Sequence, residues 1–217
     1  MDNLVTILDL IGAVAFAISG AMVALQIEFD LLGVIILACC TATGGGMIRD
    51  ITLGHIPPRA FQDPTDVFLA FLTALVVFSI AWYFNRKNES FRQSRIYRRV
   101  LFWADTLGLG IFAVIGVRHA FNAYGSDLGF LCVFCGALTG CGGGLLRDIF
   151  ANRKPYIFTE DIYATAAAAG ALVCFEFMKH GHGAIGIWVG VCLVIIIRYF
   201  ADRYHWGLPV IRDFRSE

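Results

Sequence analysis

The stretch TATGGGMIRD, Thr41 to Asp50, lies inside an otherwise continuous apolar run of the sequence. It places a glycine triad and then an Arg-Asp pair near the end of that run. Each glycine inside a helix costs about 1 kcal/mol relative to alanine, so a triad weakens a helix by roughly 3 kcal/mol. The same pattern returns as TGCGGGLLRD, Thr139 to Asp148. An unfavourable feature that occurs twice requires a physical explanation.

The residues around the two stretches have the composition of a membrane protein. Of the 217 residues, 58% are hydrophobic and 16% are charged, with a mean hydropathy of +0.71. Soluble domains carry roughly 25% charged residues. The apolar residues fall in blocks of about 20, the length that a helix needs to cross a bilayer, without the alternation of a membrane β-barrel. We therefore expect an all-α integral membrane protein.

Window length and hydropathy predict seven transmembrane helices. The N-terminus lacks the basic segment and the cleavage site of a signal peptide, so we interpret the first apolar block as a retained span. A longer polar link is expected only at Asn85–Arg99. The predicted spans cover about 4–25, 31–53, 64–84, 103–123, 127–150, 160–178 and 184–201.

The distribution of positive charge predicts the orientation in the membrane. Seven spans put the chain ends on opposite sides, and the N-terminal side carries only four of the 17 Lys and Arg residues. The positive-inside rule places the richer side in the cytoplasm. We expect a multi-pass protein of the cell (inner) membrane with its N-terminus outside and its C-terminus cytoplasmic. The net charge of zero gives no field that would attract nucleic acid.

The two glycine stretches belong to a longer internal repeat. Segment 9–20 matches segment 105–116 in Asp, Gly, Phe, Ala and Gly at an offset of 96, and the triads with their Arg-Asp pairs match at 98. Each unit holds three predicted spans. Because three is odd, the second unit starts on the opposite side of the membrane, which makes an inverted-topology repeat. The expected organisation is one membrane domain, 1–217, with repeat one at about 4–84, repeat two at about 103–178, a seventh helix at about 184–201 and a basic tail, 202–217.

A glycine triad in a span has two interpretations. Backbone released from helical bonding survives in a bilayer only beside protein or a water-filled cavity, so the first is a kinked or unwound helix at a polar pathway. The second is close helix packing, since glycine lets backbones approach. Two matched triads beside charges favour the first. The hydroxyl residues nearby either line such a pathway or, more commonly, bond back to their own helix. The candidate pore-lining and kink residues are Gly44, Gly45, Gly46, Gly142, Gly143, Gly144, Thr41, Thr43, Thr139 and Ser19.

The Arg-Asp pairs place charges where a bilayer disfavours them. A charge at a helix centre costs roughly 2.5–3.5 kcal/mol on insertion scales. Adjacent helical residues do not face each other, so Arg49 and Asp50 are expected to be poor partners. The hypothesis is a crossed pairing between repeats, Arg49 with Asp148 and Arg147 with Asp50. The alternative is an interfacial position with snorkelling arginines.

Other candidate sites have simpler interpretations. Asp9 and Asp105 lie near predicted span starts, where a carboxylate caps a helix; a role at a pore mouth is the alternative. The charged cluster at 176–182 suits a solvated loop, and the seven cysteines lie in apolar blocks as small hydrophobes. Neither triad continues as a P-loop, and no catalytic signature occurs. We expect no enzyme, no cofactor, and no metal beyond a permeant cation at backbone carbonyls near the triads.

Two three-span repeats, each ending its second span with Gly-Gly-Gly-x-x-Arg-Asp, and a seventh span resemble the prokaryotic trimeric intracellular cation (TRIC) channels. This family overlaps the bacterial "glycine transporter" domain family, and the resemblance covers nearly the whole chain. It implies a homotrimer in membrane lipid, with a pore for K⁺ or Na⁺ in each subunit. It also implies that the second and fifth helices kink at their triads and line that pore. The Lys-Glu-Val motif of the animal branch is absent, so the resemblance does not extend to regulation by Ca²⁺ or phosphoinositides.

A secondary transporter of a small amino acid such as glycine is the alternative function. Inverted repeats with helices broken at the midplane are typical of transporters too. Carbonyls and helix C-terminal ends favour a cation, whereas helix N-termini favour a carboxylate. Both kinds of end exist at each triad, so the sequence supports either function.

Overall fold

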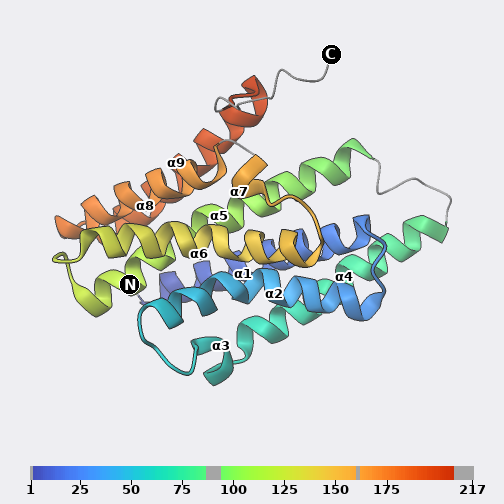
Figure 1. Cartoon of the computed structure of the whole chain (residues 1–217), viewed down its shortest axis with the longest axis horizontal. Helices are drawn as coiled ribbons and strands as arrows, with labels where there is room; N and C mark the ends of the chain where they lie inside the picture. Colours follow the sequence, from blue (N-terminus) through green and yellow to red (C-terminus); the bar gives the residue numbers. More distant parts are fainter. Residues whose placement is uncertain (1, 87–93, 160–161, 208–217) are drawn as a thin grey trace, which may run out of the picture.

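The computed structural model describes residues 2–86, 94–159 and 162–207, which form helices and no strand (Figure 1). Two single-turn helices, α3 (Arg59–Gln62) and α7 (Tyr156–Thr159), follow the second and fifth long helices. The long helices in these ranges are α1 (Asp2–Gln26), α2 (Leu31–Thr52), α4 (Thr65–Arg86), α5 (Arg95–Tyr124), α6 (Gly129–Phe150), α8 (Tyr163–Lys179) and α9 (Gly183–Tyr204).

The long helices have the dimensions of membrane spans. Among the described residues, six helices of 20 to 30 residues are long and apolar enough to cross a bilayer, with window hydropathies between 1.7 and 2.3. The remaining long helix, α8, has 17 residues, slightly fewer than the roughly 20 that a perpendicular span needs. The protein is an all-helical membrane protein, as the composition predicted.

The helices agree with the predicted spans to within a few residues, except at the start of α5. This helix begins at Arg95, eight residues before its predicted start, so part of the predicted polar link 85–99 is helical. Ser94 caps the helix by accepting a hydrogen bond from the N–H of Tyr97 at 3.1 Å. Tyr97 is fully buried and its hydroxyl donates to the carbonyl oxygen of Met22. One anchored aromatic side chain holds this turn against α1, which a hydropathy window cannot detect.

Some predicted boundaries fall partly outside the described residues. The predicted tail, 202–217, begins later than expected because α9 runs to Tyr204, and residues 208–217 lie beyond the described part of the chain. Residues 160 and 161, where the sixth span was expected to start, also lie outside the described residues.

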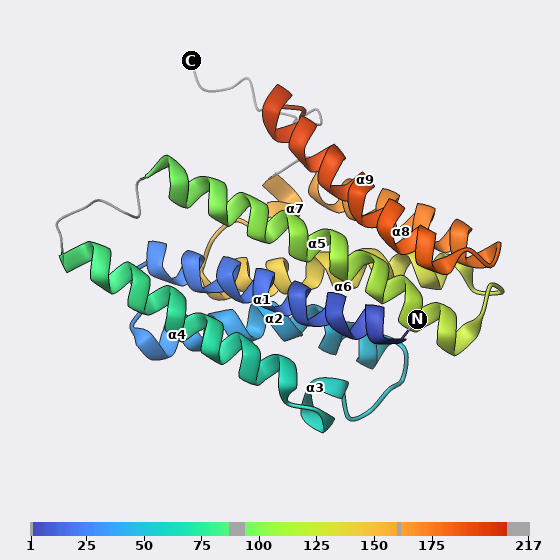
Figure 2. The ribbon, with the colours of Figure 1, turned by 180° about the vertical axis from the view of Figure 1, so that it is seen from behind.

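The helices pack in a repeated order. The order α1–α2–α3–α4 returns as α5–α6–α7–α8, and α9 follows. Figure 2 shows α1 between α4 and α5, whereas Figure 1 shows α6 between α2 and α8, and both arrangements involve direct contact. The last helix, α9, packs on α8 and α5 at the outside of the bundle. The contacts α1–α5 and α2–α6 therefore join the two units.

Equivalent residues of the two units contact each other reciprocally. A methyl group on Gly12 of α1 would lie 3.2 Å from the Phe112 ring of α5, and one on Gly108 of α5 would overlap the Phe16 ring of α1. The two rings themselves pack with their centroids 5.2 Å apart. Positions that match in the sequence thus make matching contacts in space.

Candidate functional site

The glycine triads meet where α2 crosses α6. A Cβ on Gly45 would overlap the carbonyl oxygen of Thr139, and a Cβ on Gly143 would overlap that of Thr41. A Cβ on Gly142 would lie only 3.0 Å from the Cα of Gly45. The two backbones therefore touch, which only residues without a side chain allow. This is the close helix packing that was the second interpretation of the triads.

Both helices continue through their triads without interruption. The unwound helix of the first interpretation is wrong for this conformation, because helical bonding stabilises the chain more than the triad weakens it. A kink that keeps the hydrogen bonds, and a role in lining a pathway, stay predictions.

The remaining triad glycines differ in their surroundings. Gly44 faces the side chain of Leu146, and a Cβ on Gly144 would lie 2.7 Å from the hydroxyl oxygen of Tyr163. A Cβ on Gly46 would meet only an arginine nitrogen, at 3.7 Å. The middle glycine of each triad thus lies closest to the backbone of the other helix, whereas Gly44 and Gly144 meet side chains and Gly46 has room for a methyl group.

The threonines near the triads bond to their own helices. Each hydroxyl donates to the carbonyl oxygen four residues earlier, the commoner of the two arrangements expected. A role in lining a pathway stays a prediction for these threonines. The bonds run from Thr41 to Leu37 at 2.6 Å, from Thr43 to Cys39 at 2.9 Å and from Thr139 to Cys135 at 2.5 Å.

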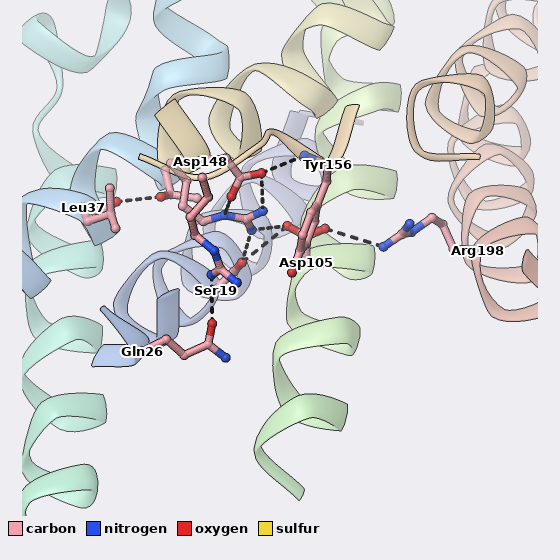
Figure 3. A network of polar contacts seen from close by, with 10 residues as sticks. Ser19, Gln26, Leu37, Asp105, Asp148, Tyr156 and Arg198 are labelled. Atoms are coloured by element: carbon pink, nitrogen blue, oxygen red, sulfur yellow. Dashed lines mark hydrogen bonds and ion pairs between the residues drawn. The ribbon is translucent and has the colours of Figure 1, made fainter. Parts of the chain in front are cut away.

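Arg147 of α6 belongs to a buried polar network, and Figure 3 shows its partners Ser19, Asp105 and Asp148. Its side chain has no exposed surface. The guanidinium donates to Asp148 on the same helix, with Nε 2.9 Å from Oδ1, and also to Asp105 of α5 and to the hydroxyl of Ser19 on α1. Ser19 Oγ in turn lies 3.4 Å from Asp105 Oδ1. Arg147 therefore ties three helices together, and pairing with hydrogen bonds is what makes a buried charge tolerable.

Arg49 of α2 has simpler surroundings. Its Nε and Nη2 donate to Oδ1 of Asp50 at 2.9 and 2.7 Å. Asp9 matches Asp105 in the repeat, but its carboxylate lies 3.9 Å from Nη1 of Arg59. The side chain of Arg59 is 51% exposed. The position that matches Ser19 is the apolar Ile115. The two arginine sites are thus equivalent in sequence but not in contacts.

The second oxygen of each adjacent aspartate holds the loop that follows. Asp50 Oδ2 accepts a hydrogen bond from the N–H of Arg59 at 2.9 Å, and Asp148 Oδ2 accepts one from the N–H of Tyr156 at 3.0 Å. These N–H groups begin α3 and α7. In both repeats, an arginine orients a carboxylate that fixes the next short helix.

The crossed pairing of Arg49 with Asp148 and of Arg147 with Asp50 is wrong, because each arginine bonds to its adjacent aspartate. The two helices cross antiparallel, since Gly45 lies against Thr139 while Thr41 lies against Gly143. At about 1.5 Å per residue, the arginines therefore diverge towards opposite ends of the crossing. The rule that neighbours do not face each other fails here because an arginine side chain is long enough to fold back.

The interpretation of Asp9 and Asp105 as helix caps is also wrong. α1 begins at Asp2 and α5 at Arg95, so both carboxylates lie well inside their helices. Asp105 is only 1% exposed. Its partner is Arg147, which makes it a member of the central network and not a terminus.

Arg198 of α9 belongs to the same network. It is buried, and its Nη2 lies 3.8 Å from Oδ2 of Asp105 (Figure 3). Its guanidinium carbon lies 4.9 Å from the centre of the Tyr163 ring and 5.2 Å from that of Phe102, within the range of a cation–π contact. Its position inside the predicted span 184–201 was the available signal, since an intramembrane charge needs a partner.

Comparisons with known proteins agree with this architecture. A family model described as "Glycine transporter" matches residues 6–82 and 102–179. These segments contain α1 to α4 and α5 to α8, except for the last residues of α4 and the first residues of α1 and α5.

Several bacterial membrane proteins are similar over almost the whole chain. A UPF0126 membrane protein of Deinococcus radiodurans is 38% identical over 94% of this chain and 91% of its own length. The UPF0126 inner membrane protein YadS of Escherichia coli K12 is 36% identical over 93% of each chain. YvgT of Bacillus subtilis is 34% identical over 97% of this chain and 98% of its own.

Solved structures of TRIC cation channels have the same fold. One, from work on conductance through these channels, is 35% identical with a TM-score of 0.81, covering 97% of this chain and 98% of its own. The orthologue from Rhodobacter sphaeroides is 28% identical with a TM-score of 0.83, covering 94% and 99%. The chain therefore belongs to the glycine transporter family of UPF0126 membrane proteins, and its structure matches the prokaryotic TRIC cation channels.

Proposed function

We propose that the protein is a homotrimeric channel for monovalent cations such as K⁺ and Na⁺, with one pore in each subunit. The similarity to solved TRIC channels carries this proposal, because 28–35% identity extends over 94–97% of the chain at TM-scores of 0.81 to 0.84. A channel supplies a path and performs no covalent chemistry, so the protein needs no catalytic residue and no cofactor.

In this proposal seven helices cross the membrane as two inverted three-helix repeats and α9, with α8 as a short span. Contacts between helix ends support the inversion. Arg153, after α6, donates to Gln26 at the end of α1 at 2.8 Å. Tyr124, at the end of α5, donates to the carbonyl of Leu53 after α2 at 3.2 Å. α1 and α6 therefore end on one side, and α2 and α5 end on the other.

The orientation follows from positive charge, with the C-terminus in the cytoplasm. The Arg153–Gln26 contact then lies on the cytoplasmic side, and the Tyr124–Leu53 contact lies outside. The similarity to YadS, named an inner membrane protein, supports an inner-membrane location.

The pore runs between α2 and α6, at the triads. In the described conformation these helices touch through Gly45 and Gly143, which leaves no space for a cation between them. Conduction therefore requires the two helices to separate at the crossing. Separation exposes the carbonyl oxygens of Thr41 and Thr139, and carbonyl oxygens are suitable replacements for the hydration shell of a monovalent cation.

Recording from the purified protein in planar bilayers tests this function. With a KCl gradient across the bilayer, we expect discrete ohmic currents whose reversal potential lies towards the K⁺ equilibrium potential. Native mass spectrometry in detergent tests the trimer separately. Silent bilayers, with protein shown to be incorporated, would eliminate the channel.

The description of the matching family model favours a second candidate, a secondary transporter of glycine. A transporter binds its substrate and changes conformation in each cycle, so uptake saturates. Liposomes that hold the protein are therefore given labelled glycine under an imposed ion gradient. Saturable uptake without single-channel currents would replace the channel by this candidate, and currents without uptake would exclude it.

A further inference from the structure

The two repeats differ most in what surrounds their arginines. Arg147 is tied to residues of α1, α5 and α6, whereas Arg49 bonds to Asp50 on its own helix. Two features of the chain produce this difference. Ser19 has the apolar counterpart Ile115 in the repeat, and α9 has no counterpart. The helix outside the repeat therefore acts on one arginine site only.

The link between α9 and this site passes through one carboxylate. Oδ1 of Asp105 contacts Arg147 and Ser19. Oδ2 faces Nη2 of Arg198 at 3.8 Å and accepts no hydrogen bond from any described residue. This separation exceeds the 2.7–3.2 Å of a hydrogen bond. Arg198 thus acts on Asp105 through its charge, in a buried environment where charges interact strongly.

The aromatic rings around Arg198 keep its charge in place. Its guanidinium lies over the rings of Tyr163, at 4.9 Å, and of Phe102, at 5.2 Å. These rings belong to α8 and α5. Arg198 can therefore orient Asp105 without depending on a hydrogen bond to it.

The charges of the network balance. Arg147 and Arg198 are offset by Asp105 and Asp148, all nearly inaccessible to solvent. Removing one cation leaves an excess negative charge in a buried site, which is unfavourable unless the site rearranges. The residue most free to rearrange is Asp105, because among the described residues only one of its oxygens is hydrogen-bonded.

We propose that Arg198 is a positioning residue: it orients Asp105 so that Arg147 stays locked to α1 and α5, and α9 thereby controls the cytoplasmic end of the pathway. The inference rests on the proposed channel function and extends it, because it locates a gate and names the helix that holds it. Loss of Arg198 frees Asp105, weakens the Arg147–Ser19 tie and favours the open state. The conduction path itself is unchanged.

A double-variant cycle tests the inference. Single-channel currents are recorded in planar bilayers for Arg198→Gln, for Asp105→Asn and for the double variant. The control is Arg203→Gln, because Arg203 is exposed on the same helix. We expect Arg198→Gln to raise open probability about tenfold, within the usual 5- to 150-fold range of coupling between sites. Unitary conductance and reversal potential stay at wild-type values. In the Asp105→Asn background Arg198→Gln has no further effect, and Arg198→Lys gates like the wild type.

Several results would overturn the inference. Independent effects of Arg198→Gln and Asp105→Asn would show that Arg198 does not act through the carboxylate. Altered conductance, or an Arg198→Lys that gates like Arg198→Gln, would point to another role. If Arg198→Gln folds only in the Asp105→Asn background, that rescue supports the coupling; if it folds in neither, Arg198 is merely structural.

A failure of the channel function itself would be distinguishable. Wild-type protein without current defeats the proposed function, and the same cycle is then measured by thermal unfolding in detergent. Arg198→Gln should lower the unfolding midpoint more in the wild type than in the Asp105→Asn background. Equal lowering in the two backgrounds would overturn the inference.

Discussion

The carbonyl oxygen of Thr139 occupies the place where a side chain of residue 45 would begin. The reciprocal contact, of Gly143 with the carbonyl of Thr41, repeats this relationship from the other helix. Each unit therefore presents a bare stretch of backbone to the other at the same crossing. The glycines that weaken α2 and α6 as isolated helices are what allow the two halves of the protein to join.

Gly45→Ala and Gly143→Ala should each destabilise the protein. The added methyl group meets backbone atoms, which cannot move as a side chain can. Overpacking typically costs about 1–3 kcal/mol, and a methyl group forced onto a backbone oxygen should lie in the upper part of that range, above the roughly 1 kcal/mol that alanine gains over glycine as a helix former. Thermal unfolding in detergent should show a lower midpoint for both variants.

Gly46→Ala is the matched control within the same triad. A Cβ there would lie 3.7 Å from the nearest atom, an arginine nitrogen. The methyl group is accommodated, so the unfolding midpoint should stay the same or rise. Equal destabilisation by Gly45→Ala and Gly46→Ala would contradict the crossing geometry described above.

Gly108→Ala should be rescued by a smaller side chain at position 16. A methyl group on Gly108 would overlap the Phe16 ring, whereas one on Gly12 would lie 2.9 Å from the Ile111 side chain and 3.2 Å from the Phe112 ring. We expect Gly108→Ala to lower the unfolding midpoint more than Gly12→Ala. In a Phe16→Leu background the effect of Gly108→Ala should shrink, because residues in contact are not additive. Additive midpoints would show that the two positions do not touch.

The sequence predicted the helices and the repeat because both depend on patterns along the chain. Apolar blocks of span length identify helices, and the matched segments around Phe16 and Phe112 identify the repeat. α5 shows the limit of this reasoning. Its first residues, Arg95 to Arg99, are largely charged, and only the buried Tyr97 shows that they continue the helix.

The partners of the charged residues were not predictable in the same way. Arg49 and Asp148 seemed complementary in a repeat, but the antiparallel crossing carries them to opposite ends. Arg198 and Asp105 are 93 residues apart in the sequence and meet only through the packing of α9 on α5. Which charges pair depends on helix direction and rotation, and neither follows from a hydropathy pattern.

A reporter fusion should locate the C-terminus in the cytoplasm. Thirteen of the 17 Lys and Arg residues lie on that side of the proposed topology, and the positive-inside rule predicts the orientation from them. A C-terminal green fluorescent protein should therefore fluoresce in bacterial cells, and a C-terminal alkaline phosphatase should be inactive. The opposite pattern would reverse the orientation, and with it the side on which the Arg147 network lies.

Arg147→Met should be far more damaging than Arg59→Met. Arg147 pairs with Asp105 of α5, and Arg59 lies near Asp9 of α1, the residue that matches Asp105 in the repeat. Arg147 is fully buried in its pair, whereas Arg59 is half exposed and 3.9 Å from its partner. Breaking a buried pair by removing one partner costs about 3–5 kcal/mol, because the remaining charge is left uncompensated.

An exposed pair, by contrast, contributes roughly 0–1 kcal/mol. Unfolding in denaturant should therefore separate the two variants clearly. Arg147→Lys, which keeps the charge but not the planar fork of donors, should lie between Arg147→Met and the wild type. Similar midpoints for Arg147→Met and Arg59→Met would mean that the buried network does not stabilise the described conformation.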